Sequence, residues 1–311
     1  SSVTTAQSLT FTSDSFVGTT LTLTPTVIPS SITINTSATT GTFADGNFIS
    51  NTSGAANILN SDLVSALAAG NVEILTSGGI TISAAVASST NSSLTLKAGA
   101  NIVQNAYAVS TQGGAITYWS DTDATSGGGI QTARGSSIQT NGGALTMSGG
   151  AATATGFAKG TLNTAFRGIN IQGSITTGAG NVIMRGEDAA TESAQTRGWG
   201  AGVAFTDDSS LTTTSGTVTI TGQTNTDNTG ANHRHSGVMF GMYMFDSVNN
   251  SAYADASIIT GTGSITVTGT ALSSSAYRDG VMFQQASMSS TSGNISITAT
   301  TASTGSYDFN F

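Results

Sequence analysis

Carboxylates and histidines are the residues of this chain that could carry chemistry, and they are few. The 311 residues include 16 Asp and Glu, two His and no Cys. The nearest approach to a catalytic pattern is a pair of acidic dipeptides, Glu187-Asp188 and Asp207-Asp208, because most glycoside hydrolases use two carboxyl groups. Both dipeptides fall in sequence typical of loops, whereas the interiors of the expected strands carry Thr, Ser, Ala and Gln. We therefore predict no catalytic residue and no enzyme activity, with a carbohydrate-active enzyme as the alternative.

Two other stretches have metal-ligating residue types but lack a full ligand set. His233 and His235 lie in one expected loop, with no carboxylate or Cys at the spacing of a zinc site. The stretch from Asp121 to Gly127 begins like a calcium loop, with alternating oxygen ligands. It lacks the glycine at the sixth position and has Thr132 where a bidentate Glu would stand. We predict polar turns at both places, with no metal and no cofactor.

Isolated aromatic residues are the third kind of candidate, because a ring offers a flat apolar face to a ligand. Trp119, Trp199, Tyr243 and Tyr253 stand near the ends of expected strands. We predict that these four contact glycans. The alternative for these residues, and for Tyr118 beside them, is that single aromatics at strand ends close the core of the fold.

A repeat of three short segments must position these residues. In each segment apolar residues alternate with small polar ones, the period of a strand with one buried face, and Gly, Ser or Asp bounds it. One full repeat runs from Gly202 to Ile220. First segments carry Ile80, Ile102, Ile130, Ile169, Val203, Val238 and Val281, and middle ones carry Val86, Val109, Ile138, Ile175, Leu211, Ile258 and Met288. Third segments are centred on Val72, Leu94, Ile116, Leu145, Val182, Val218, Ile265 and Ile295, at intervals of 22, 22, 29, 37, 36, 47 and 30 residues.

Strand trios repeated at such intervals, with insertions confined to the connections, are typical of a solenoid. No amphipathic helix of about ten or more residues separates the strands, so parallel strands must be joined by coiling. We therefore predict an all-β fold, a parallel β-helix over residues 70–300 with an apolar core. Extra residues enter mainly after the third strand, with one insertion after a first strand at 242–256. Loops that leave one corner should mark the functional side.

The section before the repeat, residues 1–69, is predicted to be an irregular β opening section or a cap. Residues 36–56 are rich in Thr, Ser, Gly and Asn and are predicted to form a loop. A short helix is expected at about 61–69, with Asn60 or Ser61 as its N-cap and Gly70 after its last turn.

The two extremities of the chain are predicted to pair with other strands. Leu9 and Phe11 belong to an alternating run without charge, which leaves a strand edge open to pairing. Residues 301–311 are predicted to form a terminal edge strand, with Tyr307, Phe309 and Phe311 on one side. We expect either a native chain that continues beyond these ends or subunits joined head to tail through these residues into a filament.

Composition excludes several classes of partner. The net charge is −8, and the two Lys and six Arg are not clustered, so no basic stripe is available for nucleic acid. No stretch of 18 apolar residues is present, so we predict no transmembrane segment. The absence of Cys excludes a disulfide framework and is typical of long proteins that are exported unfolded.

Three stretches resemble a known family. They are Ser65-Ala-Leu-Ala-Ala-Gly-Asn-Val-Glu-Ile, Ser77-Gly-Gly-Ile-Thr-Ile and Ser93-Leu-Thr-Leu-Lys-Ala-Gly-Ala-Asn-Ile-Val. They resemble the large filamentous-haemagglutinin-type exoproteins of Gram-negative bacteria, which are secreted by the two-partner route. The resemblance is strongest over residues 57–147 and stays visible as a pattern to 297. The chain has no Asn-Pro motif, so it does not resemble that family's secretion domain.

The resemblance implies a right-handed β-helix, here of about seven three-stranded coils with loop insertions. It also implies a non-enzymatic adhesin or structural fibre at the cell surface, outside the cell. The expected partners are glycans or proteins on host or neighbouring cells, together with further copies of the chain.

Overall fold

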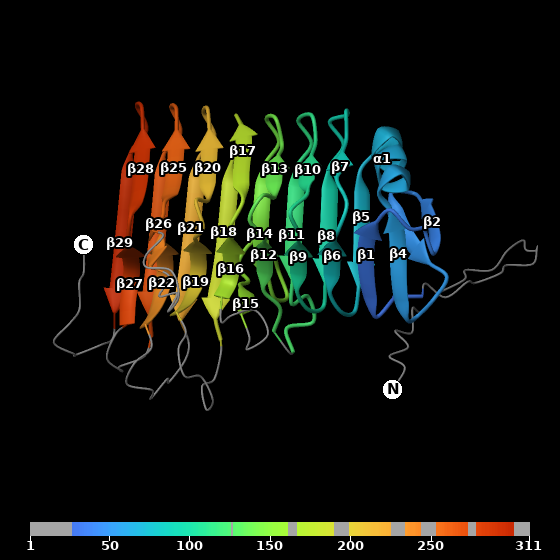
Figure 1. Ribbon diagram of the computed structural model, residues 1–311, viewed down its shortest axis with the longest axis horizontal. Helices are drawn as coiled ribbons and strands as arrows, with labels where there is room; N and C mark the ends of the chain where they lie inside the picture. Colours follow the sequence, from blue (N-terminus) through green and yellow to red (C-terminus); the bar gives the residue numbers. More distant parts are fainter. Residues whose placement is uncertain are drawn as a thin grey trace, which may run out of the picture.

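The computed structural model describes residues 27–125, 127–160, 167–189, 199–224, 234–243, 253–272 and 278–301. Within these ranges the chain is nearly all β, with one α-helix, and its strands stack along the long axis of the molecule (Figure 1). Long parallel sheets of many strands contain almost all of them. This arrangement is compatible with a β-solenoid, as the repeat predicted.

Three sheets run the length of the molecule. The order in the nine-stranded sheet is β27 (Arg278–Phe283), β22 (Arg234–Phe240), β19 (Trp199–Phe205), β16 (Arg167–Ile171), β12 (Ile130–Thr132), β9 (Ile102–Gln104), β6 (Ile80–Ile82), β1 (Ser31–Asn35) and β4 (Ala55–Leu59). The order in the seven-stranded sheet is β28 (Ala286–Ser290), β25 (Ala256–Thr260), β20 (Ser210–Thr213), β17 (Ser174–Gly178), β13 (Ser137–Gln139), β10 (Ala108–Ser110) and β7 (Val86–Ala87).

The eleven-stranded sheet has the order β2 (Gly41–Ala44), β3 (Asn47–Ser50), β5 (Val72–Thr76), β8 (Leu94–Ala98), β11 (Ile116–Ser120), β14 (Leu145–Gly149), β18 (Val182–Asp188), β21 (Val218–Thr224), β26 (Ile265–Ala271) and β29 (Ile295–Thr301). Its remaining strand, β15 (Ala158–Gly160), pairs with β18. A separate antiparallel pair joins β23 (Met242–Tyr243) to β24 (Tyr253–Ala254).

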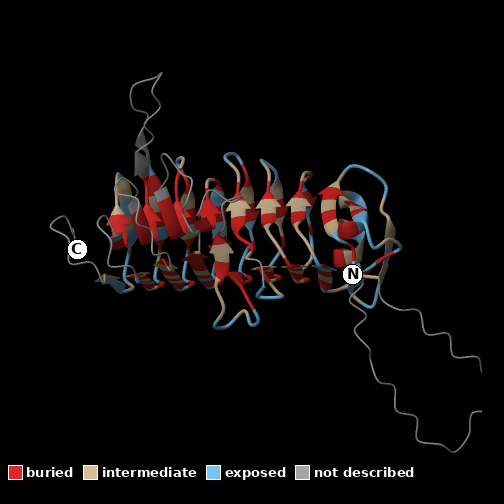
Figure 2. Cartoon of the chain, turned by 90° about the horizontal axis from the view of Figure 1, so that it is seen from below, coloured by how far each residue is buried: buried red, intermediate tan, exposed pale blue. Residues whose placement is uncertain are grey.

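The three predicted segments lie one in each sheet, and the register follows the predicted series. In the eleven-stranded sheet, Ile116 pairs with Leu145, Leu145 with Val182 and Val182 with Val218, although the intervals between them differ. The apolar residues of all three series point inward, so that buried and more exposed residues alternate along the strands (Figure 2). Because register is fixed by which face is buried, insertions change the loops and leave the core unchanged.

The backbones of the eleven- and nine-stranded sheets touch along a row of glycines, which we name the glycine seam. Its members are Gly186, Gly202, Gly222, Gly237, Gly269 and Gly280. A Cβ atom built on Gly222 would lie 1.9 Å from the carbonyl oxygen of Gly237, and one built on Gly269 would lie 1.9 Å from that of Gly280. No side chain fits here, so glycine is required by close approach. Strands β18, β21 and β26 continue past the seam, into sequence predicted as loop.

The predicted loop at 36–56 is wrong. This section forms the hairpin β2–β3, in which Phe43 pairs with Phe48 and their ring centroids are 5.5 Å apart, and then strand β4. The pairing depends on contacts that local composition does not reveal. The predicted helix is present as α1 (Asn60–Ala69), but Leu59 is its N-cap residue, without a side-chain cap bond. Gly70 follows the helix as predicted and donates its N–H to the carbonyl of Ala66.

These elements close the N-terminal end of the three sheets. Helix α1 covers β7 with Leu63 and Leu67, and the carbonyl of Leu67 accepts a hydrogen bond from Thr90 Oγ1 at 2.9 Å. The hairpin covers β5, with Asn47 paired to Glu73.

The free edge of β4 is satisfied by the segment before the hairpin. Thr40 donates its N–H to the carbonyl of Asn57 at 2.9 Å and accepts the Asn57 N–H on Oγ1 at 2.7 Å. Thr39 Oγ1 accepts the N–H of Leu59 at 2.9 Å. Within the predicted section 1–69, the residues from Thr39 to Ala69 therefore cover the first strands of the three sheets, and residues 1–26 lie outside the described ranges.

Candidate functional site

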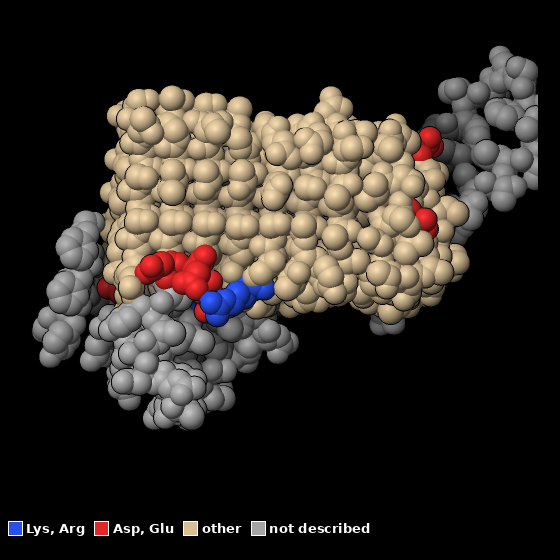
Figure 3. All heavy atoms as spheres, turned by 45° about the horizontal axis from the view of Figure 1, so that its top comes forward, with Lys and Arg blue, Asp and Glu red and all other residues tan. Residues whose placement is uncertain are grey.

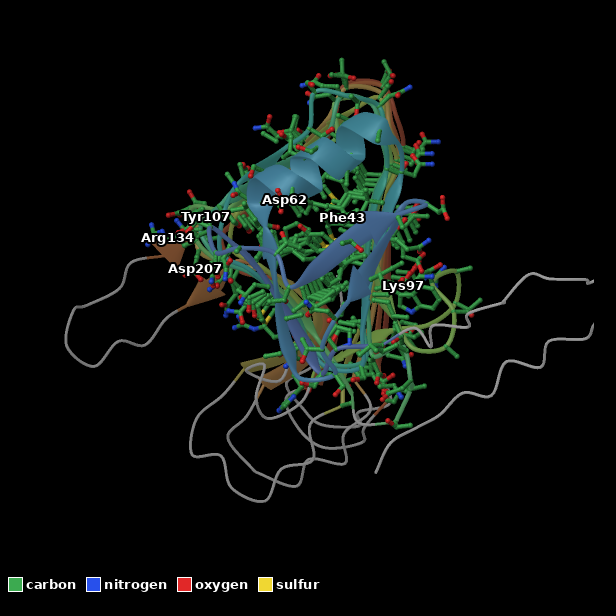
Figure 4. The ribbon with its side chains drawn as sticks, turned by 90° about the vertical axis from the view of Figure 1, so that its right-hand side faces the viewer. Phe43, Asp62, Lys97, Tyr107, Arg134 and Asp207 are labelled. Carbon is green, nitrogen blue, oxygen red and sulfur yellow. The ribbon has the colours of Figure 1, made fainter. Side chains whose placement is uncertain are left out.

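Polar and aromatic side chains line up at the corner between the nine- and seven-stranded sheets. Tyr107 follows β9, Arg134 follows β12, Gln172 follows β16, and Asp207 and Asp208 follow β19. Because neighbouring strands are about 4.8 Å apart, these positions form a row along the long axis. Figure 4 shows Tyr107, Arg134 and Asp207 together on one side of the molecule. We name these five residues the polar corner.

Ion pairs and hydrogen bonds connect the members of the polar corner across successive turns. Arg134 Nη2 lies 2.9 Å from Asp208 Oδ2, and the side-chain amide of Gln172 donates to Asp207. Asp207 and Asp208 both have positive φ, 55° and 60°, which Asp tolerates better than most residues because its short side chain can bond locally. Since the Arg134–Asp208 pair is exposed, it contributes little to stability, and both groups are available to a ligand.

Tyr107 is 43% exposed, and its backbone is held by a hydrogen bond. Its carbonyl accepts a hydrogen bond at 2.8 Å from Nε2 of the buried Gln104. Gln104 Oε1 in turn accepts the hydroxyl of Tyr118 at 3.0 Å. Tyr118 is fully buried, and burial raises its pKa, so its ring belongs to the core and is not open to a sugar. A rigid backbone with an exposed ring suits stacking on a flat ligand.

The insertion after the first strand at 242–256 lies at the same corner. It forms the pair β23–β24, in which Tyr243 and Tyr253 are directly opposite each other. The N–H of Asp255, just after β24, donates to Asp208 Oδ1 at 3.1 Å. The hairpin base therefore adjoins the acidic end of the polar corner, although the side chains of these two tyrosines lie outside the described part of the structure.

Of the four predicted glycan contacts, Tyr243 and Tyr253 are register partners, and Trp119 and Trp199 lie on other strands. Trp119 lies on the outer face of the eleven-stranded sheet, and its Nε1 donates to the carbonyl of Gly150 at 2.7 Å. Lys97 Nζ is 5.0 Å from the centroid of its ring and pairs with Glu73 at 2.8 Å. The indole of Trp119 is thus already in contact with Gly150 and Lys97.

The side chain of Trp199 and all of the predicted assembly residues lie outside the described part of the structure. Trp199 begins β19, at the opposite end of that strand from Asp207, and its side chain is not among those described. The predicted assembly residues Leu9, Phe11, Tyr307, Phe309 and Phe311 all lie outside the described residues.

A second polar group, which we name the buried cluster, lies beyond the glycine seam. It consists of Arg167, Glu187, Asp188 and His235, all buried. The prediction that Glu187-Asp188 and His235 lie in loops is wrong, because they belong to strands β18 and β22. Asp188 Oδ2 contacts His235 Nδ1, so the pair fastens the eleven-stranded sheet to the nine-stranded sheet. The prediction of loops rested on the charge of these residues, which is unusual inside a strand.

Other contacts complete the buried cluster. Glu187 Oε2 accepts from Gln223 Nε2 at 3.0 Å, and Arg167 Nη1 donates to Asn170 Oδ1 at 2.8 Å. Burial lowers the pKa of Arg167 to about 10, against the opposing effect of Asp207 and Asp188. A Cβ on Gly200 would collide with both Asp188 and His235, so the closely packed pair requires glycine at that position.

The predicted carboxylate dipeptides lie toward opposite ends of strand β19. Asp188 adjoins Gly200, near the start of β19, while Asp207 follows the end of the same strand. Asp188 contacts His235, whereas Asp207 accepts a hydrogen bond from Gln172, so the two carboxylates have different partners, although the charges of both act on Arg167. The buried cluster therefore has a structural role in the contact between the sheets.

The calcium-like turn is closed by its own backbone. Asp121 Oδ1 accepts the N–H of Gly127 at 3.0 Å, and Asp123 Oδ1 accepts that of Thr125 at 3.1 Å. Burial raises the pKa of Asp121, while the charge of Lys159 opposes the shift. Across the described ranges, no group of three or more His, Cys, Asp or Glu residues is arranged to hold a metal ion. His233 lies outside those ranges.

The residues of the polar corner missed by sequence reasoning are Tyr107, Arg134 and Gln172. A signal for them exists, because each stands three to five residues after the apolar residue of a first segment: Ile102, Ile130 or Ile169. Asp207 follows Val203 in the same way.

In the described part of the chain, no helix is long and apolar enough to cross a membrane. A scan against protein-family models finds no matching family, and searches of curated proteins and of solved structures find no match either.

Proposed function

We propose that this chain is a non-enzymatic, extracellular cell-surface adhesin or structural fibre protein that binds glycans at the polar corner. Its scaffold would be a right-handed parallel β-helix of about seven three-stranded coils, as the resemblance to filamentous-haemagglutinin-type exoproteins implies. The observation that carries the proposal is the row of exposed and half-buried side chains from Tyr107 to Asp208, at one corner of the stack of strands.

The side chains of the polar corner have the chemistry of a sugar site. The half-exposed ring of Tyr107 offers an apolar face for the C–H groups of a pyranose ring. Arg134 and Asp208 supply donors and acceptors for adjacent hydroxyl groups, and the amide of Gln172 supplies both. A row of such groups along the strand stack suits an extended oligosaccharide better than a single sugar.

The outer surface of the sheets supports a structural or adhesive role. In the seven-stranded sheet, Ser137, Ser174, Ser210, Ser257 and Ser287 follow one another in register on the outer side. The face in Figure 3 is almost free of charged side chains, which gather along its lower edge and near the N-terminal end. A surface of hydroxyl groups with little charge gives weak electrostatic steering, so recognition would depend on short-range contacts.

Glycan-array binding by the full chain tests the proposal. We expect binding to a subset of oligosaccharides, and a decrease of about tenfold or more in affinity, near 1.4 kcal/mol, for Tyr107→Ala or Arg134→Ala. Lys97→Ala is the matched control, because Lys97 is a charged residue on a different face, and it should bind like the wild type. No binding to any glycan, or equal losses in all three variants, would contradict the proposal.

A carbohydrate-active enzyme is the second candidate, favoured by the two consecutive carboxylates Asp207 and Asp208 at the polar corner. On this reading, glycans that bind would also be cleaved, and Asp207→Asn or Asp208→Asn would abolish turnover while leaving binding nearly intact. Binding without turnover on the same glycan panel favours the adhesin.

A further inference from the structure

The outer face of the eleven-stranded sheet has few charged side chains, and among its described strands the cations outnumber the carboxylates. The charged residues at outer positions are Glu73, Lys97, Lys159, Arg185 and Glu187. Lys97 pairs with Glu73 at 2.8 Å, and Glu187 accepts a hydrogen bond from Gln223 at 3.0 Å. This face therefore has one cation in excess, although the whole chain has a net charge of −8.

Arg185 is the cation that remains without a carboxylate partner. The charge of Lys159 acts on Asp121, and Lys97 has Glu73. The side chain of Arg185, by contrast, makes no hydrogen bond or ion pair with another described residue, and its Nε atom is buried without an acceptor. Arg185 as a whole is half-buried, so part of its side chain remains accessible to a ligand.

A second buried polar atom without a partner lies next to Arg185. Met147 and Met184 are register partners and point inward, so the residues that follow them, Ser148 and Arg185, are neighbours on the outer face. Ser148 is fully buried, and its Oγ has no hydrogen-bond partner among the described residues. Because buried polar atoms nearly always have partners, two without one on adjacent strands indicate a place for an external acceptor.

The connection between β14 and β15 borders this place. It returns to the sheet as β15, where Ala158 is the register partner of Gly186, the residue after Arg185. At its start, the carbonyl of Gly150 accepts a hydrogen bond from Trp119 Nε1 at 2.7 Å. The connection is therefore fastened at both ends, and it fixes the indole beside the guanidinium. A site whose walls are already in position loses less entropy when it binds a ligand.

We propose that Arg185, Trp119 and Thr221 bind the carboxylate-bearing sugar of an acidic glycan, a uronic acid. A guanidinium can donate two parallel N–H bonds to one carboxylate. Thr221, the register partner of Arg185, offers a hydroxyl group to the sugar, and the indole offers an apolar wall. From β11 to β21 the site spans about 14 Å, the length of a short oligosaccharide. One unpaired cation is too few for nucleic acid, which requires a basic stripe.

This site is separate from the polar corner. Lys97, whose Nζ is 5.0 Å from the centroid of the Trp119 ring, lies in Figure 4 on the side opposite Tyr107, Arg134 and Asp207. The polar corner also has two carboxylates for one guanidinium, so it would repel a uronate. Neutral glycans would thus bind at the corner and acidic ones at the eleven-stranded sheet, and either site can be tested without the other.

Calorimetric titration of the full chain with oligomers of galacturonic or mannuronic acid, and with their methyl esters, tests the proposal. The ester keeps the sugar ring and removes the charge. We expect at least one of the free acids to bind about tenfold or more tightly than its ester, because a hydrogen bond to a charged group contributes that much. Arg185→Ala and Arg185→Gln should abolish this difference, since variant and ester remove the same contact and their effects should not add.

Arg134→Ala is the matched control, an arginine on the opposite side of the molecule, and it should keep the full preference for the acid. Circular dichroism of each variant checks that the sheets persist. Four results would overturn the proposal: no binding of either uronate, equal binding of acid and ester, a preference that survives in both Arg185 variants, or one that Arg134→Ala removes. Binding of uronates that depends on Arg185, without any binding of neutral glycans, would support this site and contradict the polar corner.

Discussion

The glycine seam gives the sharpest stability prediction, the substitution Gly222→Ala. The added Cβ would lie 1.9 Å from the Gly237 carbonyl oxygen and 2.7 Å from its carbonyl carbon. Because Cβ atoms essentially never come within 3.0 Å of such an atom, one backbone must move by about 1.1 Å. Both backbones belong to hydrogen-bonded central strands, so the movement is shared with their neighbours.

We expect Gly222→Ala to lower the free energy of unfolding by about 3 kcal/mol or more, the upper end of the usual cost of overpacking. Urea denaturation measures the loss through the midpoint at constant slope. Gly70→Ala is the control, because a Cβ there meets nothing within 4 Å, and its effect should stay within about 0.5 kcal/mol. If Gly222→Ala were as stable as the control, the sheets would not be in backbone contact along the seam.

Three further substitutions test the core and one buried carboxyl group. Val218→Asp places a charge without a partner among the inward residues and should destabilise the chain by several kcal/mol in urea denaturation; a loss below about 1 kcal/mol would contradict the inward position. Phe240→Ala removes the middle ring of a stack with centroid spacings of 5.5 and 5.0 Å, and we expect a loss of about 3 to 5 kcal/mol by the same assay. Burial raises the pKa of the Asp121 carboxyl group above its ordinary value of 3.8, so the folded chain keeps the carboxyl proton to a higher pH than the unfolded chain does. The free energy of unfolding therefore falls as the pH rises from 3.8 through the raised pKa. Asp121→Asn keeps an acceptor for the N–H of Gly127, so this variant should be more stable than the wild type at pH 7 and should lose that advantage below pH 3.8. Denaturation curves of both proteins across this pH range measure the difference. If the carboxyl group were better solvated than its burial indicates, the wild type would be the more stable protein at pH 7.

The repeated strands could be predicted because their signal is local and periodic. Val72, Leu94 and Ile116 each begin a short alternating run, and the same pattern at Ile265 and Ile295 survives much longer insertions. Since burial of one face fixes register, alternation alone is enough to place these residues in one row.

The remaining features depend on contacts between distant segments. The hairpin at Phe43 and Phe48 forms in sequence with the composition of a loop, because the two rings pack against each other and against the core. Glu187, Asp188 and His235 are buried in strands, contrary to the usual position of charged residues. Asp188 and His235 contact each other across the seam, and Glu187 accepts a hydrogen bond from Gln223 on the neighbouring strand of its own sheet. The intrinsic strand propensity of these residues could not reveal the partners that allow their burial.

The polar corner was only partly predictable. Asp207 and Asp208 were recognised as candidate residues, but Tyr107 and Arg134 carry no motif of their own. They become neighbours because each occupies the same corner of successive turns, a relation that follows from the repeat only when corner positions are compared across its units.

The order of β4, β1 and β6 in the nine-stranded sheet bears on how the chain folds. After β1 the chain forms the hairpin β2–β3, and β4 then returns to pair on one side of β1, while β6 pairs on the other. The loops that close this end are short, so the entropy of closing them is small, and the end can form before the later strands. Each subsequent strand trio then adds to an existing template, as in other quasi-one-dimensional proteins. For a chain that emerges N-terminus first, folding would start at the closed end and advance in one direction, and forced or thermal unfolding would begin away from this end.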